Sequence, residues 1–99
     1  MDVDKAITLA VKTGKVALGT KRSIKLLKQG KPKIVIISKN CPKEIMDEIL
    51  YYGKLSEIPV YTYSGTSWDL GAVCGRPHMV ACMAVENPGD SKILKLKEE

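Results

Sequence analysis

The stretch Lys33-Ile34-Val35-Ile36-Ile37-Ser38 decides the fold of this 99-residue chain. Its apolar centre is entirely β-branched, which favours a strand over a helix. Both alternating faces of the stretch are apolar, so the strand must be covered on both sides, as it is between two layers of helices. The stretch therefore predicts the central strand of an α/β fold.

The segments before and after this strand alternate between helical and extended patterns. Apolar residues recur at helical spacing over residues 3–13, residues 16–18 fit a short strand, and residues 20–29 are helical again. After the central strand, Pro42 at the first helical position opens a long helix. We expect the buried stripe of that helix to be Ile45, Met46, Ile49, Leu50 and Leu55.

The second half of the chain continues the alternation. Residues 58–63 form a strand with a proline near its start, as an edge strand tolerates, and Thr66 with Asp69 predicts an acidic capping box for a short helix. Residues 79–85 predict a further buried strand, whereas residues 91–96 fit either a helical turn or an edge strand. This order predicts a three-layer α/β/α sandwich around a four-stranded sheet, in one domain over residues 1–99.

Charge is unevenly divided along the chain. Between Lys5 and Lys43 there are eleven lysines or arginines and no carboxylate, whereas residues 44–99 hold five basic and nine acidic residues. The net charge of +5 thus sums a strongly basic first half and a mildly acidic second half. The basic stretch concentrates a positive potential that a polyanion can use, although a solvated lysine-rich surface has the same composition.

The cysteines and the single histidine predict no metal site. Cys41, Cys74 and Cys82 are odd in number and lack a Cys-x-x-Cys spacing. We expect free, mostly buried thiols in a reducing cytosol, with neither a metal nor another cofactor. The acidic start of the chain lacks an apolar signal region, and no apolar run is long enough to cross a membrane, so a cytoplasmic protein without a membrane partner is expected.

The segment from Gly14 to Lys21 resembles a phosphate-binding P-loop only superficially. In that motif a lysine directly follows the second glycine, whereas here Gly19 is followed by Thr20 and only then by Lys21. The residues between the two glycines, Lys-Val-Ala-Leu, are typical of a strand rather than a loop. A small phosphate-ligand enzyme is therefore a remote alternative, and we expect no catalytic activity.

The same segment is better explained as a strand-to-helix junction that faces a phosphate backbone. Gly19 permits close approach of a ligand, and free N–H groups at the start of a helix can bind an anion. The helix adds a row of lysines at i, i+4 and i+7, namely Lys21, Lys25 and Lys28. An ordinary solvated helix face is the alternative for the later members of that row. The resulting candidate RNA-binding residues are Gly19, Thr20, Lys21, Arg22, Lys25 and Lys28.

Two further segments complete the candidate surface. Lys39 and Asn40 follow the central strand, where ligands of open α/β sheets commonly bind. An asparagine amide can read a base edge, or it can instead satisfy its own loop backbone. The third segment, Arg76-Pro77-His78, joins the short helix to the last strand and offers an arginine for phosphate and a histidine that could stack on a base or be purely structural.

Aromatic residues are too scarce for a row of stacking rings on a sheet face. The chain has four tyrosines, one tryptophan and no phenylalanine. Because Trp68, Tyr51 and Tyr52 lie in helical segments, we expect them to be packing residues rather than stacking platforms.

Several blocks of sequence, taken together and in order, resemble a known family. The blocks are Gly14-Lys15-Val16-x-x-Gly19-x-Lys21, Lys33-Ile34-Val35-Ile36-Ile37-x-x-Asn40, Tyr51-Tyr52-x-x-Leu55-Ser56-x-Ile58-Pro59-Val60-Tyr61, Leu70-Gly71, Gly75-Arg76-Pro77-His78 and Pro88-Gly89-Asp90-Ser91-x-Ile93-Leu94. They resemble the kink-turn-binding superfamily and, within it, the family of large-subunit ribosomal proteins numbered thirty in archaea and eukaryotes. The resemblance extends over essentially the whole chain.

The resemblance implies a three-layer α/β/α fold and a non-enzymatic, structural role in the large ribosomal subunit. Such proteins bind kink-turns of RNA, in which an internal loop with sheared G·A pairs bends the helix sharply. By similarity, Asn40 reads a base of the G·A pairs, Lys21 reaches base or backbone, and Pro77 and His78 pack against an extruded nucleotide. The loops after the first two strands can share an edge with the loop before the fourth only if the fourth strand runs opposite to them, so a mixed sheet is predicted.

The first loop distinguishes two branches of the superfamily. The branch found in small nucleolar-type particles typically has Gly-Thr-Asn-Glu there, whereas this chain has Gly19-Thr20-Lys21-Arg22, which favours the ribosomal branch. The expected partners are ribosomal RNA and other components of the large subunit, and the free chain is expected to be monomeric. A regulatory or processing ribonucleoprotein subunit that binds a kink-turn in mRNA or guide RNA is the alternative.

Overall fold

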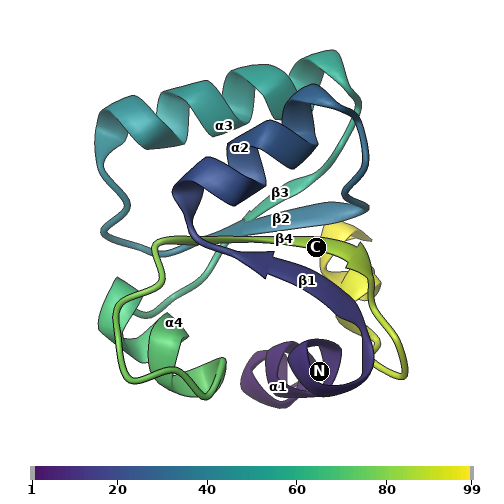
Figure 1. Cartoon of the computed structure of the whole chain (residues 1–99), viewed down its shortest axis with the longest axis vertical. Helices are drawn as coiled ribbons and strands as arrows, with labels where there is room; N and C mark the ends of the chain where they lie inside the picture. Colours follow the sequence, from purple (N-terminus) through teal and green to yellow (C-terminus); the bar gives the residue numbers. More distant parts are fainter. Residues whose placement is uncertain (1, 99) are drawn as a thin grey trace.

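The computed structural model describes residues 2–98 of the chain, with the side chains of residues 2–96. They form the predicted three-layer sandwich, in which α2 and α3 cover one face of the sheet while α1, α4 and a 3-10 helix, η1, cover the other (Figure 1). The elements in chain order are α1 (Val3–Thr13), β1 (Lys15–Leu18), α2 (Thr20–Lys28), β2 (Ile34–Ile37), α3 (Lys43–Leu55), β3 (Val60–Thr62), α4 (Ser67–Val73), β4 (Cys82–Asn87) and η1 (Ile93–Glu98).

The sheet is mixed, as predicted. Its strand order is β1-β4-β2-β3, with β4 antiparallel to both β1 and β2 and with β2 parallel to β3. β3 lies at an edge and is directly preceded by Pro59, whose carbonyl accepts from the Val35 N–H at 3.0 Å. A proline is tolerated here because it stands at the start of the strand. Because β4 runs against its neighbours, the segment that enters β4 lies at the same edge as the segments that leave β1 and β2.

The central strand β2 is buried on both faces, which confirms the prediction from its sequence. Ile34 and Ile36 pack in a core shared with α1, α4 and η1, whereas Val35 and Ile37 pack in a second core shared with α2 and α3. None of the four is more than 1% exposed, so burial of each side chain contributes roughly 1.5–3 kcal/mol.

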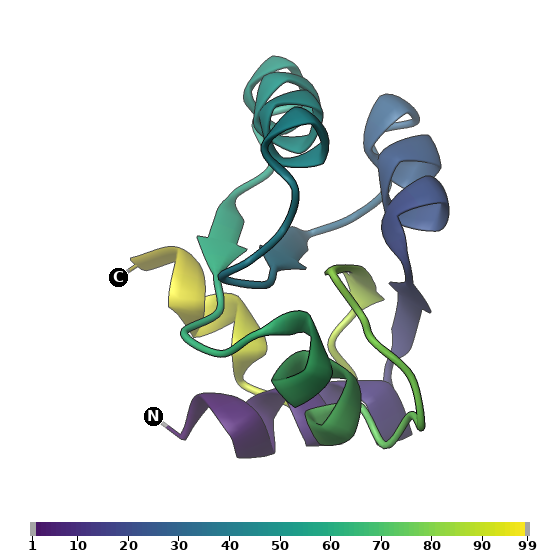
Figure 2. The same ribbon diagram turned by 90° about the vertical axis from the view of Figure 1, so that its left-hand side faces the viewer.

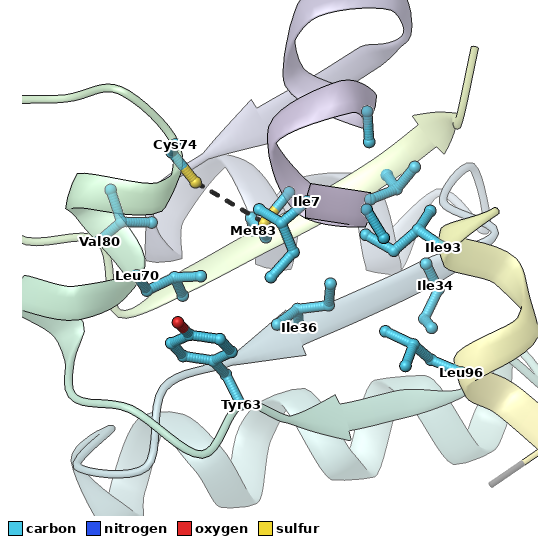
Figure 3. Close-up of a cluster of buried hydrophobic side chains, with 13 residues drawn as sticks. Ile7, Ile34, Ile36, Tyr63, Leu70, Cys74, Val80, Met83, Ile93 and Leu96 are labelled. Atoms are coloured by element: carbon cyan, nitrogen blue, oxygen red, sulfur yellow. Dashed lines mark hydrogen bonds between the residues drawn. The ribbon is translucent and has the colours of Figure 1, made fainter. Parts of the chain in front are cut away.

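The larger core lies between the sheet and the layer of α1, α4 and η1 (Figure 3). Ile7 from α1 and Leu70 from α4 meet Met83 of β4 there, and Ile93 and Leu96 of η1 close its other end. The segment over residues 91–96, which the sequence left undecided between helix and strand, is thus part of a 3-10 helix whose apolar residues complete this core.

Two features of α3 differ from the prediction. Pro42 is the N-cap residue and not the first helical residue, and Leu50 and Leu55 are 46% and 65% exposed instead of buried. At 100° per residue, these leucines lie about 100° and 120° around the helix from Ile49, the residue that faces the sheet. A helix packed by one face alone cannot bury all three.

The last strand begins later than the sequence predicted. Residues 79–81 form part of a loop, and β4 extends instead through Asn87, which pairs with Lys15. The loop residues bond elsewhere, since the Val80 N–H donates to the carbonyl of Ser67 in α4 (3.0 Å). This loop is therefore attached to a helix at the edge of the sheet.

Candidate nucleic-acid interface

Three loops meet at one edge of the sheet and enclose a groove of about 500 Å³. They are the β1–α2 junction, the loop between β2 and α3, and the loop between α4 and β4. Figure 2 shows the starts of α2, α3 and α4 together with the last of these loops on the side that faces the viewer. The groove is lined by Gly19, Thr20, Asn40, Pro42, Ile45, Ser67, Met79 and Ala81.

Backbone hydrogen bonds fix the loops to one another. The Gly19 N–H donates to the carbonyl of Cys82 at 2.8 Å, and the Ser38 N–H donates to the carbonyl of Ala81 at 2.9 Å. The Lys39 N–H donates to the carbonyl of Gly65, which precedes α4. The three segments thus form one connected edge although they are far apart in the sequence.

The first loop presents an uncapped helix start. Gly19 has φ +109° and ψ 157°, a backbone conformation that favours glycine, and a Cβ there would meet no atom within 4 Å. No side chain caps α2 and its first turn has no acidic residue, whereas Asp2 caps α1 and α4 has a Thr66–Asp69 capping box. The positive end of the α2 dipole is therefore left without an anion of the protein's own.

Two cations occupy the same first turn. Lys21 and Arg22 are exposed there, where the helix dipole disfavours positive charge. Among the side chains that the structure describes, one ion pair is present, between Lys15 Nζ and Glu86 Oε2 at 3.0 Å. None of the cations of the three loops is therefore paired with a carboxylate among the described side chains, and the first loop suits a bound anion.

The structure divides the predicted row of lysines on α2. Arg22 and Lys25 line a shallow groove of about 320 Å³ beside β1, together with Lys31. Lys28 instead lies over the ring of Tyr52 in α3, with Nζ 5.1 Å from the ring centroid. Lys25 thus continues the basic surface of the first loop, whereas Lys28 faces the neighbouring helix.

The second loop holds Asn40 in one orientation. Its side-chain Oδ1 accepts hydrogen bonds from the Ser67 N–H at 2.8 Å and from the Ser67 hydroxyl at 3.1 Å. A backbone N–H can only donate, so the atom facing it must be the amide oxygen. The Nδ2 group of this exposed residue is consequently free to donate two hydrogen bonds to a ligand.

The third loop lies close over α4. A Cβ on Gly71 would lie 2.1 Å from the His78 carbonyl oxygen, so only glycine allows the loop to cross the helix at this point. The residues Arg76, Pro77 and His78 are exposed, and the His78 Nδ1 is 3.2 Å from the carbonyl oxygen of Met79. None of these three residues lines the groove itself, but Met79, the next residue of the loop, does.

Several residues of this edge were not predicted from the sequence. Ser67, which orients Asn40, is identified only by its contact with a residue 27 positions away. Met79, expected inside a strand, lines the groove and is 54% exposed. The expectation that Trp68 and Tyr51 are packing residues is wrong, since they are 62% and 61% exposed.

The three cysteines are in the free, buried state that the sequence predicted. Cys41, Cys74 and Cys82 are free and buried, and burial raises the pKa of the Cys74 thiol to about 11 and that of Cys82 to about 12. Among the side chains of residues 2–96, no cluster of three or more histidine, cysteine or acidic groups could hold a metal ion. No helix in the described part of the chain combines the length and apolar character needed to cross a membrane.

Comparison with known proteins places this arrangement in a family. Residues 1–95 match the profile of the ribosomal protein L7Ae/L30e/S12e/Gadd45 family. Three relatives carry the name large ribosomal subunit protein eL30. The protein of Methanopyrus kandleri is 54% identical over 94% of this chain and 85% of its own length. The protein of Methanothermobacter thermautotrophicus is 52% identical over 97% and 98%, and that of Methanococcus vannielii is 52% identical over 100% and 94%.

The fold also has a counterpart among solved structures. A protein of unknown function from Bacillus halodurans C superimposes with a TM-score of 0.84, covering 99% of this chain and 98% of that one. The two sequences are only 22% identical, so this likeness concerns the fold alone.

Proposed function

The chain belongs to the ribosomal protein L7Ae/L30e/S12e/Gadd45 family, and on this basis we propose that it is a structural protein of the large ribosomal subunit that binds ribosomal RNA at a kink-turn. The family is one of ribosomal, RNA-binding proteins and not of enzymes. The single observation that carries the proposal is the fixed amide of Asn40 at the centre of three convergent loops. The whole of residues 1–99 is proposed to act as one kink-turn RNA-binding domain, monomeric when free and located in the cytoplasmic ribosome.

Asn40 is the proposed base-reading residue. Its amide oxygen is occupied by Ser67, so its Nδ2 group can only donate. The O6 and N7 atoms of guanine are the acceptors that such a donor would recognise on a base edge. We therefore assign Asn40 to a guanine of the sheared G·A pairs.

The need to reach a base edge favours an internal loop over a regular duplex. In A-form RNA the major groove is deep and narrow, so side chains cannot read the bases there. Asn40 lines a groove at the surface of the protein, together with residues of the neighbouring loops. A site of this shape requires RNA whose base edges are already opened, which a sharply bent internal loop supplies.

The first loop is proposed to bind the backbone beside that base. No side chain caps the start of α2, where Gly19 and Thr20 line the groove, and Lys21 and Arg22 stand on the same turn. A phosphate there would satisfy the N–H groups, complement the helix dipole and neutralise the two cations. Lys39 from the second loop and Lys25 from the side of α2 would extend this contact, with Lys28 as its most distant member.

The third loop is proposed to hold an extruded nucleotide. Pro77 and His78 are exposed beside the groove, and Met79 adds an apolar surface to its lining. Bases that leave a stack are commonly bound by such apolar and ring-shaped side chains. Arg76 is placed to pair with the phosphate of the same nucleotide.

A binding comparison tests the proposal. The protein is titrated with a kink-turn RNA and with the same RNA whose G·A pairs are replaced by Watson–Crick pairs. We expect the kink-turn RNA to bind at least about fivefold more tightly, because one base contact alone is worth about 1–3 kcal/mol. For both RNAs, log affinity should fall with log salt concentration by about 0.7–0.9 per phosphate neutralised. Equal affinity for the two RNAs would refute kink-turn recognition.

Co-sedimentation distinguishes the ribosomal role from that of a regulatory or processing particle. A ribosomal protein should remain with large subunits through a high-salt wash. Release of the protein into lighter particles would instead support the regulatory or processing role.

A further inference from the structure

The structure leaves Trp68, the one tryptophan of the chain, exposed beside the groove. Its side chain is 62% exposed, although exposure of a large aromatic side chain to water costs free energy. It is the second residue of α4 and directly follows Ser67, which lines the groove. Of the large apolar side chains that are exposed in the described residues, it and Met79 are the two that belong to the loops and helix start around the groove.

The backbone that carries Trp68 is held firmly in place. The capping box joins the Thr66 N–H to Asp69 Oδ2 at 2.9 Å and the Asp69 N–H to Thr66 Oγ1 at 3.3 Å. The intervening Ser67 donates its N–H to Asn40 and accepts from the Val80 N–H. Trp68 thus follows a residue that is hydrogen-bonded to both the second and the third loop. Because the backbone here is already ordered, little conformational entropy is lost when Trp68 binds a ligand.

The third loop lies on the same side of α4 as Trp68. Trp68 and Gly71 are three residues apart and so share a face of the helix, and the His78 carbonyl lies against Gly71. Trp68 and the loop containing Pro77 and His78 therefore flank one another at the rim of the groove. Apolar and ring-shaped side chains predominate here, with Arg76 as the one arginine or lysine, whereas the first loop is basic.

From this placement, we propose that Trp68 is a further RNA-binding residue, which stacks on an unpaired nucleobase next to the kink-turn site. The inference rests on the proposed function and extends it, because it adds a base contact outside the G·A pairs. Every base has a π-face, so the contact would add affinity without demanding a particular base. It would also require an unpaired nucleotide, and so favours RNAs that have one at this position.

Trp68→Ala and Trp68→Phe test this contact, with Tyr51→Ala as the matched control. Tyr51 has nearly the same exposure but lies on the outer face of α3, eight residues beyond its start. For a kink-turn RNA with unpaired nucleotides we expect Trp68→Ala to lose roughly 5- to 150-fold in affinity, the range of one base–aromatic stack. Trp68→Phe should recover most of that loss, and Tyr51→Ala should bind as the unmodified protein does.

The fluorescence of Trp68 provides a second, direct measurement. Because the chain has a single tryptophan, quenching on RNA binding reports on this side chain alone. An RNA in which only the unpaired nucleotides next to the kink-turn site are made abasic, and not the extruded one, should still bind, but with less quenching and with the affinity that Trp68→Ala shows. Thermal unfolding of both variants should match that of the unmodified protein, since the side chain is exposed.

The outcomes separate the two proposals. If the unmodified protein binds the kink-turn RNA selectively, yet its fluorescence is unchanged and Trp68→Ala binds within about twofold of it, the stacking role is refuted while the proposed function stands. If the unmodified protein does not distinguish kink-turn RNA at all, the proposed function fails and the stacking role with it.

Discussion

Replacement of Asn40 by Asp separates the structural role of this residue from its proposed role in reading a base. Aspartate has nearly the same shape and retains an oxygen for both Ser67 donors, at 2.8 and 3.1 Å in the present structure. It replaces the Nδ2 donor, however, with a second acceptor oxygen that carries negative charge. The fold should therefore tolerate a change that the RNA does not.

The stability effect can be estimated from the contacts. A carboxylate near the start of α4 gains about 0.3–1 kcal/mol from the helix dipole, and repulsion from the nearby Asp69 carboxylate opposes part of that gain. The free energy of unfolding of Asn40→Asp should thus stay within about 1 kcal/mol of the original. In Asn40→Ala, by contrast, the N–H and hydroxyl of Ser67, a residue only 7% exposed, lose their acceptor, which should cost about 1–3 kcal/mol.

The effect of the two substitutions on RNA binding should not follow their effect on stability. Loss of the base-directed donor should weaken binding of the kink-turn RNA by about 1–3 kcal/mol, or roughly 5- to 150-fold, in both variants. A plain duplex of the same length should lose far less, except for a small electrostatic loss with Asp. Urea unfolding and titration of the two RNAs measure the two quantities in parallel. Equal losses on kink-turn and duplex RNA, or a kink-turn affinity unchanged in Asn40→Asp, would refute the base-reading role.

Three further substitutions test other parts of the site and fold. Gly71→Ala should destabilise the protein by about 1–3 kcal/mol in urea unfolding and weaken kink-turn binding, because its Cβ would displace the His78 carbonyl. An unchanged unfolding midpoint would contradict the close contact between the third loop and α4. Lys25→Ala should weaken kink-turn and duplex RNA alike and reduce the salt dependence by about one phosphate, and a selective loss on kink-turn RNA would contradict a backbone contact. Burial raises the pKa of the Cys82 thiol to about 12 from a usual 9, so as pH rises this thiol loses its proton in the unfolded state before it does so in the folded state. The free energy of unfolding should therefore fall above about pH 9, by up to about 1.4 kcal/mol per pH unit. Urea unfolding from pH 8 to 11 measures this fall, which should be shallower in Cys82→Ala. The same slope in both proteins would contradict the claim that the folded state keeps this thiol buried and neutral.

The proposed site combines a term that attracts RNA in general with a term that selects among RNAs. The uncapped start of α2 and its cations act on phosphate, which every RNA has. Asn40 and, by our inference, Trp68 act on bases that a regular duplex does not expose. Selectivity for a bent internal loop therefore depends on a few rigidly held side chains, and the basic stretch of the sequence supplies only the attraction.

Features that depend on residues close together in the chain could be predicted from the sequence. The alternation of elements, the doubly covered strand β2, the capping box at Thr66 and the junction at Gly19 follow from local periodicity and local hydrogen bonds, and the structure contains each of them. Antiparallel pairing of β4 was also predictable, once the three loops were assumed to share one edge.

The tertiary structure alone decided which side chains are buried, which are exposed and which are oriented. Leu50 and Trp68 have large apolar side chains of the kind found in protein cores. The arrangement of the whole sandwich determines which face of each helix packs, however, and it leaves both side chains in solvent. The amide of Asn40 receives its direction from Ser67, 27 residues further along the chain, through contacts that no local pattern encodes. The sequence thus placed the charge and the loops, and the packing of distant segments determined which atoms of those loops can face RNA.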